Sequence, residues 1–175
     1  MRPVSARESD PAARDPIPRR FAGKLRPAMP SEWRVLVDHR LGMWRDIGGR
    51  TPQQLAAHRA IYRRWIVPRI RSGEVIVLLF EVPRRGVVAS GGIWFRPEQP
   101  RPGAQQSSVP YLFSMYTEPE LRGRGLASKI VREAVRICRR RGFTRVTLHA
   151  APMARRIYRR LGFERAWEMR LSLAR

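Results

Sequence analysis

The stretch "LRGRGLASK", from Leu121 to Lys129, places two glycines directly before a segment whose apolar residues recur at helical spacing. A strand-like run, "YLFSMYT" from Tyr111 to Thr117, precedes it. A strand that passes through a glycine turn into a helix presents unpaired backbone N–H groups and the positive end of the helix dipole. Glycine also lets a bulky anion approach the backbone without meeting a Cβ. The sequence therefore predicts an anion site, suited to a phosphate, at the start of a helix.

Three phosphate-binding motifs compete for this stretch. A Walker A loop ends in Gly-Lys-Ser/Thr, which the stretch lacks. The dinucleotide fingerprint needs Gly or Ala where Ser128 stands and an acidic residue at the end of the next strand, which instead ends in His149 and Ala150. The third motif fits better: "RGRGLA", residues 122–127, resembles the Arg/Gln-x-x-Gly-x-Gly/Ala signature of the GNAT acetyltransferases.

The resemblance extends to both sides of that signature. "MYTEPELRGRGLA", residues 115–127, resembles the family's fourth-strand ending, proline turn and cofactor loop. "IYRRLGF", residues 157–163, resembles its late "LY-x-x-LGF" helix and strand, about 35 residues further on. The likeness in motifs covers roughly residues 111–173, whereas the N-terminal half matches only in the order of its elements.

The remaining patterns predict an α/β or α+β fold with a mixed, mostly antiparallel central sheet and helices on both faces. Residues 1–23 lack apolar periodicity and predict a disordered tail, which leaves 24–175 as a single domain. Ser31 is expected to cap the first helix, a capping box at Thr51 to begin the second, and Pro68 to kink or end it. The expected elements are a strand at 24–29, helices at 31–47 and 52–67, strands at 74–82, 87–95 and 111–117, a helix at 126–141, a strand at 145–150, a helix at 152–161 and a final alternating strand at 163–173.

The net charge of +22 is the unusual feature of the composition. A basic surface attracts anions, so nucleic acid, anionic lipid and a polyphosphate ligand all become candidates. Only Lys24 and Lys129 are lysines, however, and arginine occurs in all four predicted helices and in several other segments rather than in one element. This distribution is typical of codon usage in a GC-rich genome, and it makes nucleic-acid binding the weaker interpretation.

Composition also limits where the protein works. No apolar run approaches the ~20 residues of a membrane helix, the longest being "VIVLLF" at residues 75–80. Cys138 is the single cysteine, so an intramolecular disulfide is excluded and a metal site is not expected. The N-terminus carries charges without an apolar signal region. We therefore expect a cytoplasmic protein without a membrane partner.

The resemblance to GNAT enzymes implies acetyl-CoA as the acyl donor and a primary amine, on an unidentified small molecule or peptide, as the acceptor. It implies direct attack of the amine within a ternary complex. The cosubstrate's pantetheine arm would lie along the strand end at Met115, Tyr116 and Thr117. Its pyrophosphate would bind the turn formed by Arg122, Gly123, Arg124, Gly125, Leu126 and Ala127, of which Arg124 occupies a variable position.

The same resemblance implies that Tyr158 donates a proton to the leaving thiolate, although a packed core aromatic is the alternative for this side chain. The base that accepts the amine's proton does not carry over, because Tyr111 stands near the position where some relatives have glutamate. Glu81, Glu118 and His149 are the remaining candidates. Ala151 also departs from the family, in which many members have a cofactor-contacting asparagine.

Substrate choice is expected in the N-terminal half, in a pocket formed by the two N-terminal helices and the loop at 96–110. Trp33, His39, Met43 and Trp44 are candidates for its lining, with core packing the preferred interpretation for the two tryptophans. Two further outcomes stay open: a non-catalytic acyl-CoA-binding regulatory module in place of an enzyme, and a homodimer formed through the apolar face of residues 163–173.

Overall fold

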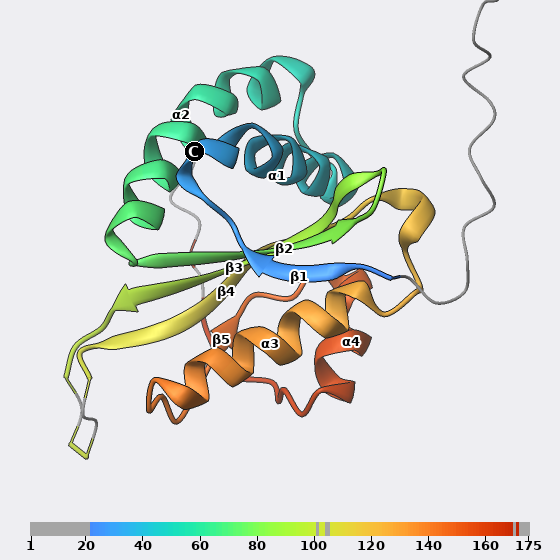
Figure 1. Cartoon of the computed structure of the whole chain (residues 1–175). Helices are drawn as coiled ribbons and strands as arrows, with labels where there is room; N and C mark the ends of the chain where they lie inside the picture. The colour runs from blue at the N-terminus through green and yellow to red at the C-terminus, as the bar shows by residue number, and fades with distance from the viewer. Residues whose placement is uncertain (1–21, 101, 104–105, 170, 172–175) are drawn as a thin grey trace, which may run out of the picture.

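The computed structural model describes residues 22–100, 102–103, 106–169 and 171. A five-stranded sheet runs through the middle of the protein, with helices against both faces (Figure 1). The family-like α/β architecture expected from the sequence is therefore confirmed. Most of the predicted N-terminal tail lies outside the described residues.

The sheet has the order β1-β2-β3-β4-β5, so neighbouring strands are also consecutive along the chain, and α3 lies in the connection that crosses from β4 to β5. Strands β1 to β4 pair antiparallel, and β5 pairs with β4 in parallel at one edge of the sheet. The strands are β1 Lys24–Pro27, β2 Val75–Val82, β3 Gly86–Pro97, β4 Ser108–Thr117 and β5 Thr147–Leu148.

Two helices cover each face of the sheet. Helices α1 and α2 lie on one face, and α3 and α4 lie on the other (Figure 1). No described helix combines the length and the apolar character that crossing a membrane requires. The helices are α1 Trp33–Ile47, α2 Pro52–Ser72, α3 Leu126–Arg140 and α4 Arg155–Arg160, with short 3-10 turns at Pro30–Glu32, Pro119–Leu121 and Pro152–Ala154.

The helix ends test three local predictions. The Thr51 capping box is confirmed, because Thr51 Oγ1 accepts from the Gln54 N–H at 3.2 Å and the Gln54 side chain accepts from the Thr51 N–H at 2.9 Å. Ser31 does not cap α1: it lies inside a 3-10 turn whose Glu32 carboxylate accepts from the Met29 N–H. Helix α2 does not end at Pro68 but continues to Ser72. Pro68 is exposed, so water can satisfy the carbonyl that loses its N–H partner.

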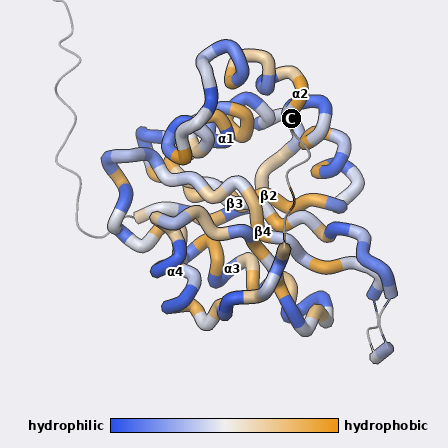
Figure 2. Tube along the Cα trace, turned by 180° about the vertical axis from the view of Figure 1, so that it is seen from behind, coloured by the Kyte–Doolittle hydropathy of each residue, from blue (hydrophilic) through white to orange (hydrophobic). Residues whose placement is uncertain are grey.

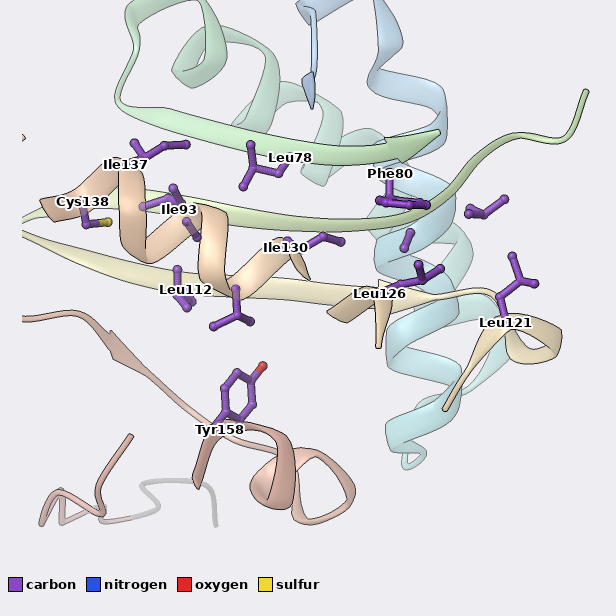
Figure 3. Close-up of a cluster of buried hydrophobic side chains, with 14 residues drawn as sticks. Leu78, Phe80, Ile93, Leu112, Leu121, Leu126, Ile130, Ile137, Cys138 and Tyr158 are labelled. Atoms are coloured by element: carbon purple, nitrogen blue, oxygen red, sulfur yellow. The ribbon is translucent and has the colours of Figure 1, made fainter. Parts of the chain in front are cut away.

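Two hydrophobic cores sandwich the sheet, and β2 contributes to both. Its side chains alternate as a strand requires: Leu78 and Phe80 pack toward α3, whereas Val77 and Leu79 pack toward α1 and α2. The hydrophobic residues concentrate between the layers, and the outer turns are hydrophilic (Figure 2). Figure 3 shows the α3-side core, in which Ile130 and other α3 side chains face the sheet. The sheet is therefore a rigid support for groups at its strand ends.

The predicted final strand is wrong for the described residues. Residues 163–169 belong to no strand, and the Trp167 and Met169 side chains are 87% and 97% exposed. An alternating pattern forms a strand only where a neighbouring strand satisfies its backbone and a core covers one face. Among the described residues the segment pairs with no strand, and it packs against the α3-side core through Phe163 at its start. The homodimer that this apolar segment would allow stays a prediction.

Candidate active site

The glycine turn at the start of α3 has the conformation that an anion site requires. Gly123 and Gly125 have φ angles of 74° and 79°, in the left-handed region that favours glycine, and Gly125 is the N-cap of α3. No side chain caps the helix, and a Cβ added at either glycine would meet no atom within 4 Å. Leu126 is buried in the α3-side core and anchors the turn. The space beside both glycines at the start of α3 is therefore open.

The strand that leads into this turn contains a bulge. Phe113 lies opposite Gly92 and Tyr116 opposite Ser90, so Ser114 and Met115 together face the single residue Gly91. Ser114 has a φ of 51°, which is uncommon for a residue with a Cβ. A Cβ on Gly91 would come within 2.2 Å of Met115 Sδ, so the Met115 side chain packs into space that the glycine leaves open. The bulge takes two backbone units out of the ladder and makes them available to a ligand.

The sheet opens beside this bulge. Strand β5 pairs with β4 only through Thr147 and Leu148, opposite Tyr111 and Leu112, and the pairing ends just before the bulge. A cavity of about 660 Å³ lies where the strands part, between the N-terminal helices and the chain that follows β5. Its lining includes Arg40, Met43, Trp44, Asp46, His58, Tyr62, Trp65, Trp94, Tyr111, Phe113, Ser114, Met115, His149, Ala151, Pro152 and Tyr158.

Tyr158 serves both the core and the cavity. Its side chain is 9% exposed, packs edge-to-face on Phe163 at 5.7 Å, and rises from α4 toward the sheet (Figure 3). Burial, with a smaller contribution from Tyr111, raises the pKa of Tyr158 to about 12. A phenol in this environment keeps its proton at neutral pH. The structure places Tyr158 both in the core and in the lining of the cavity, and proton donation by this side chain stays a prediction.

The other predicted cosubstrate residues are gathered along the bulge and the turn. Met115 lines the cavity, whereas the Tyr116 ring lies 4.9 Å from the His39 ring, beside α1. The Arg122 guanidinium donates to the Thr117 carbonyl at 3.0 Å and forms an ion pair with Asp46 at 2.6 Å. Arg122 therefore ties the turn to α1. Arg124 and Ala127 lie within the same turn, Arg124 exposed and Ala127 partly buried.

Of the three candidate bases, only His149 lies at the cavity. Glu81 pairs with Arg26 at 2.7 Å, and Glu118 lies 3.9 Å from Arg85, and neither is among the cavity-lining residues. His149 follows β5 directly and reaches the cavity because β5 parts from β4. The structure thus separates candidates that the sequence left equivalent.

His149 is the middle of a hydrogen-bonded row. Its Nδ1 lies 2.6 Å from the Tyr111 hydroxyl, and its Nε2 lies 2.5 Å from a carboxylate oxygen of Glu168. The Glu168 carboxylate can only accept, so Nε2 of the ring carries a hydrogen and donates it. In a neutral ring Nδ1 then has the lone pair, and the Tyr111 hydroxyl donates to Nδ1. Neither Tyr111 nor Glu168 was predicted to be functional, because their sequence positions carry no spacing signal toward His149.

The acceptor side combines predicted and unpredicted groups. Met43 and Trp44 line the cavity, whereas Trp33 belongs to the core that packs under α1 and α2. His39 is buried, bonded to Ser90 Oγ at 2.8 Å, and does not line the cavity; its burial lowers its pKa to about 4. The connection between β3 and β4 is shorter than expected, and its described residues line a separate hollow of about 460 Å³ beside residues 142–145.

Sequence comparison identifies the class of protein that this fold and cavity define. Residues 37–163 match the Acetyltransferase (GNAT) family. The chain therefore belongs to that family. The match spans the helices α1 to α4 and includes both the glycine turn and Tyr158.

Solved structures give the same fold. A GCN5-related N-acetyltransferase from Ralstonia eutropha is 26% identical, with a TM-score of 0.79 over 87% of this chain and 99% of that one. A predicted acetyltransferase from Clostridium acetobutylicum, solved with acetyl-CoA, is 22% identical, with a TM-score of 0.77 over 86% and 96%. An aminoglycoside antibiotic 6'-N-acetyltransferase from Acinetobacter haemolyticus is 18% identical, with a TM-score of 0.65 over 87% and 98%. No curated protein sequence matches the chain.

Proposed function

We propose that the protein transfers an acetyl group from acetyl-CoA to a primary amine by direct attack in a ternary complex. The observation that carries this proposal is the convergence of three features on one cavity: the β4 bulge, the buried phenol of Tyr158 and the His149 row. The open glycine turn follows the same strand. A site that only sensed acyl-CoA would need the turn and the bulge but not the two proton-handling groups.

The glycine turn fits the cosubstrate's pyrophosphate. Gly123 and Gly125 leave space where side chains would stand, and the first turn of α3 contains no acidic residue that would repel an anion. The bulge at Ser114 and Met115 supplies backbone groups outside the ladder for the pantetheine arm. A backbone N–H at the bulge would also stabilise negative charge that develops on the thioester oxygen.

Tyr158 is the proposed proton donor to the leaving thiolate. Its raised pKa, about 12, keeps the hydroxyl protonated throughout the physiological range. The phenol hydroxyl would donate a hydrogen bond to the leaving sulfur and pass its proton to it as the carbon–sulfur bond breaks.

The row Tyr111, His149 and Glu168 is the proposed path for the amine's proton. Tyr111 and His149 line the same cavity as Tyr158, and the Tyr111 hydroxyl is at the end of the row opposite Glu168. A proton taken by the Tyr111 oxygen would be matched by passage of the Tyr111 hydroxyl proton to His149 Nδ1. Glu168 would hold the resulting imidazolium, as a carboxylate does behind a catalytic histidine.

The proposed step balances without an added reagent. The amine nitrogen forms a bond to the acetyl carbonyl carbon, and the bond from that carbon to sulfur breaks. One amine proton leaves through Tyr111 to His149, and the Tyr158 proton goes to the thiolate. The products are the N-acetylated amine and free CoA.

The test is amine-dependent release of CoA from acetyl-CoA by the full-length protein. We expect acetyl-CoA to bind and CoA to be released in proportion to N-acetylated product for at least one class of primary amine. Binding of acetyl-CoA without release across a panel of amino acids, amino sugars, polyamines and peptide N-termini would establish a regulatory acyl-CoA-binding module instead. The similar enzyme from Acinetobacter haemolyticus makes aminoglycosides part of that panel.

A further inference from the structure

Arg40 is a charged group in the cavity that the acetyl-transfer chemistry leaves unused. Its Nη1 donates to Ser114 Oγ at 2.7 Å, and its Nε lies 3.5 Å from His58 Nε2. The guanidinium carbon lies 5.0 Å from the Tyr62 ring centroid and 5.5 Å from that of Trp44. A guanidinium has five N–H donors, and among the described residues no partner engages Nη2. The outer edge of the fork is therefore available to a ligand.

The described residues around Arg40 provide no counter-ion for it. Asp46 is the one carboxylate among the described residues that line the cavity, and it is already paired with Arg122 at 2.6 Å. Burial lowers the pKa of Arg40, opposed by smaller contributions from Tyr62 and Tyr111. A partly buried cation without a matching anion is costly, and a bound anion would offset that cost. The cavity therefore favours an acceptor with a negative group and disfavours a polycation.

The position of Arg40 fixes where that negative group would lie. Ser114 accepts from Arg40 and is one of the two bulge residues beside which the acetyl group would be held. An anion on the free edge of Arg40 would lie close to the reacting carbonyl. The amine that attacks this carbonyl must then be attached within a few bonds of the anion.

The far wall of the cavity is aromatic. The Trp65 ring meets Trp94 edge-on at 5.4 Å and Phe113 edge-on at 5.7 Å. The Trp94 indole N–H is already bonded to Glu74 at 2.8 Å, so this wall offers the ligand apolar surface. An apolar or aromatic side chain would fit against it.

We propose that the acceptor is the α-amino group of an apolar or aromatic amino acid, whose carboxylate binds the free edge of the Arg40 guanidinium. This inference rests on the proposed acetyl transfer at the same cavity. A planar carboxylate matches the guanidinium fork in two parallel hydrogen bonds, whereas a phosphate dianion would call for more than one cation.

The test compares phenylalanine with two analogues that lack its carboxylate, phenylalaninamide and 2-phenylethylamine, in the CoA-release assay. We expect kcat/KM for phenylalanine to exceed that for either analogue by about 30-fold or more, since each analogue leaves the buried guanidinium unpaired. Preference for an analogue, for phosphoethanolamine or for spermidine would overturn the proposal.

Variants of Arg40 test the residue itself. Arg40→Met should lower kcat/KM for phenylalanine by about 30-fold or more and leave the rates with the amide nearly unchanged. Arg40→Lys should recover only part of the loss, because an ammonium lacks the fork. Arg63→Met is the matched control, because Arg63 also lies over a tryptophan, Trp33 at 4.2 Å, but outside the cavity lining. Equal losses with both acceptors in Arg40→Met, at unchanged thermal stability, would contradict the assignment.

A binding measurement separates this inference from the proposed function. If no amine releases CoA, phenylalanine is titrated calorimetrically into the protein saturated with CoA. Binding that is present in the wild type and lost in Arg40→Met would support the carboxylate site although transfer had failed. Absence of binding by the wild type would overturn it.

Discussion

The cosubstrate side and the acceptor side of the cavity bind by different means. At the glycine turn and the β4 bulge, the groups proposed to bind acetyl-CoA are backbone units, at Gly125 and at the two residues opposite Gly91. On the acceptor side they are side chains from different elements, such as Arg40 on α1 and Trp65 on α2. The proposed cosubstrate side therefore depends on backbone conformation, and the proposed acceptor side depends on the identity of side chains. Substitutions should therefore divide into those that affect acetyl-CoA and those that affect only the amine.

The largest effect is expected at Tyr158, where the two sides meet. Tyr158→Phe keeps the ring against Phe163 but removes the proton donor. We expect kcat to fall by about 10²-fold or more, with acetyl-CoA affinity unchanged, in steady-state assays and calorimetry. Because the pKa of Tyr158 is raised to about 12, its donor form persists well above neutral pH, so wild-type kcat should not decline between about pH 7 and pH 10 through this group. Full turnover by the variant would remove Tyr158 from the mechanism.

A smaller effect is expected from the proton path on the amine. His149→Ala should lower kcat/KM for the amine by about 10- to 100-fold at neutral pH. The loss should shrink as pH rises, because the free amine then loses its proton to solvent. Glu168→Gln should give a smaller loss of kcat/KM with the same dependence on pH, since it changes only the hydrogen-bond partner of His149 Nε2.

Glu164→Gln is the matched control for that carboxylate, because Glu164 is exposed on the same segment. A loss that stayed constant with pH in His149→Ala, or an equal loss in Glu164→Gln, would show that the row has no role in proton transfer.

An effect of about tenfold is expected from a methyl group at the glycine turn. Gly125→Ala places a Cβ where the phosphate would approach, and we expect calorimetry to give about tenfold weaker binding of acetyl-CoA. Gly73→Ala is the control for backbone strain alone, because Gly73, at φ 76° and ψ 3°, has nearly the conformation of Gly125, at φ 79° and ψ 7°. Both variants should lose roughly 1 kcal/mol of unfolding free energy. Equal acetyl-CoA affinity in the two would mean that the turn does not bind the phosphates.

The smallest effect on function is expected at His39, which is bonded to Ser90 on β3 and does not line the cavity. Burial lowers its pKa from about 6.5 to about 4, so its contribution to stability is complete above about pH 6.5 and is lost as pH falls toward 4. The loss should reach about 2 kcal/mol at pH 5. Urea unfolding at about pH 7.5 and pH 5 measures this loss. The unfolding free energy of His39→Gln should fall by about 2 kcal/mol less over this range than that of the wild type. Identical pH dependence in both would contradict the buried neutral state.

The same contrast explains what the sequence could predict. Backbone recognition requires glycine at fixed positions, so the turn at Gly123 and Gly125 left a local motif, and the strands and helices around it followed from periodicity. Arg40, Tyr111 and His149 come from three elements and meet only because β4 and β5 part after Leu112. No motif or spacing in the sequence predicts that these three residues line one cavity. The final strand failed for a related reason, since alternation at Trp167 and Met169 does not specify a partner strand.

The most direct test of this division is calorimetric titration of acetyl-CoA into the wild type, Gly125→Ala and Arg40→Met. We expect Gly125→Ala to weaken acetyl-CoA binding about tenfold, and Arg40→Met to leave acetyl-CoA binding unchanged but to lose binding of the amino-acid acceptor. Weaker acetyl-CoA binding in Arg40→Met together with unchanged binding in Gly125→Ala would contradict it.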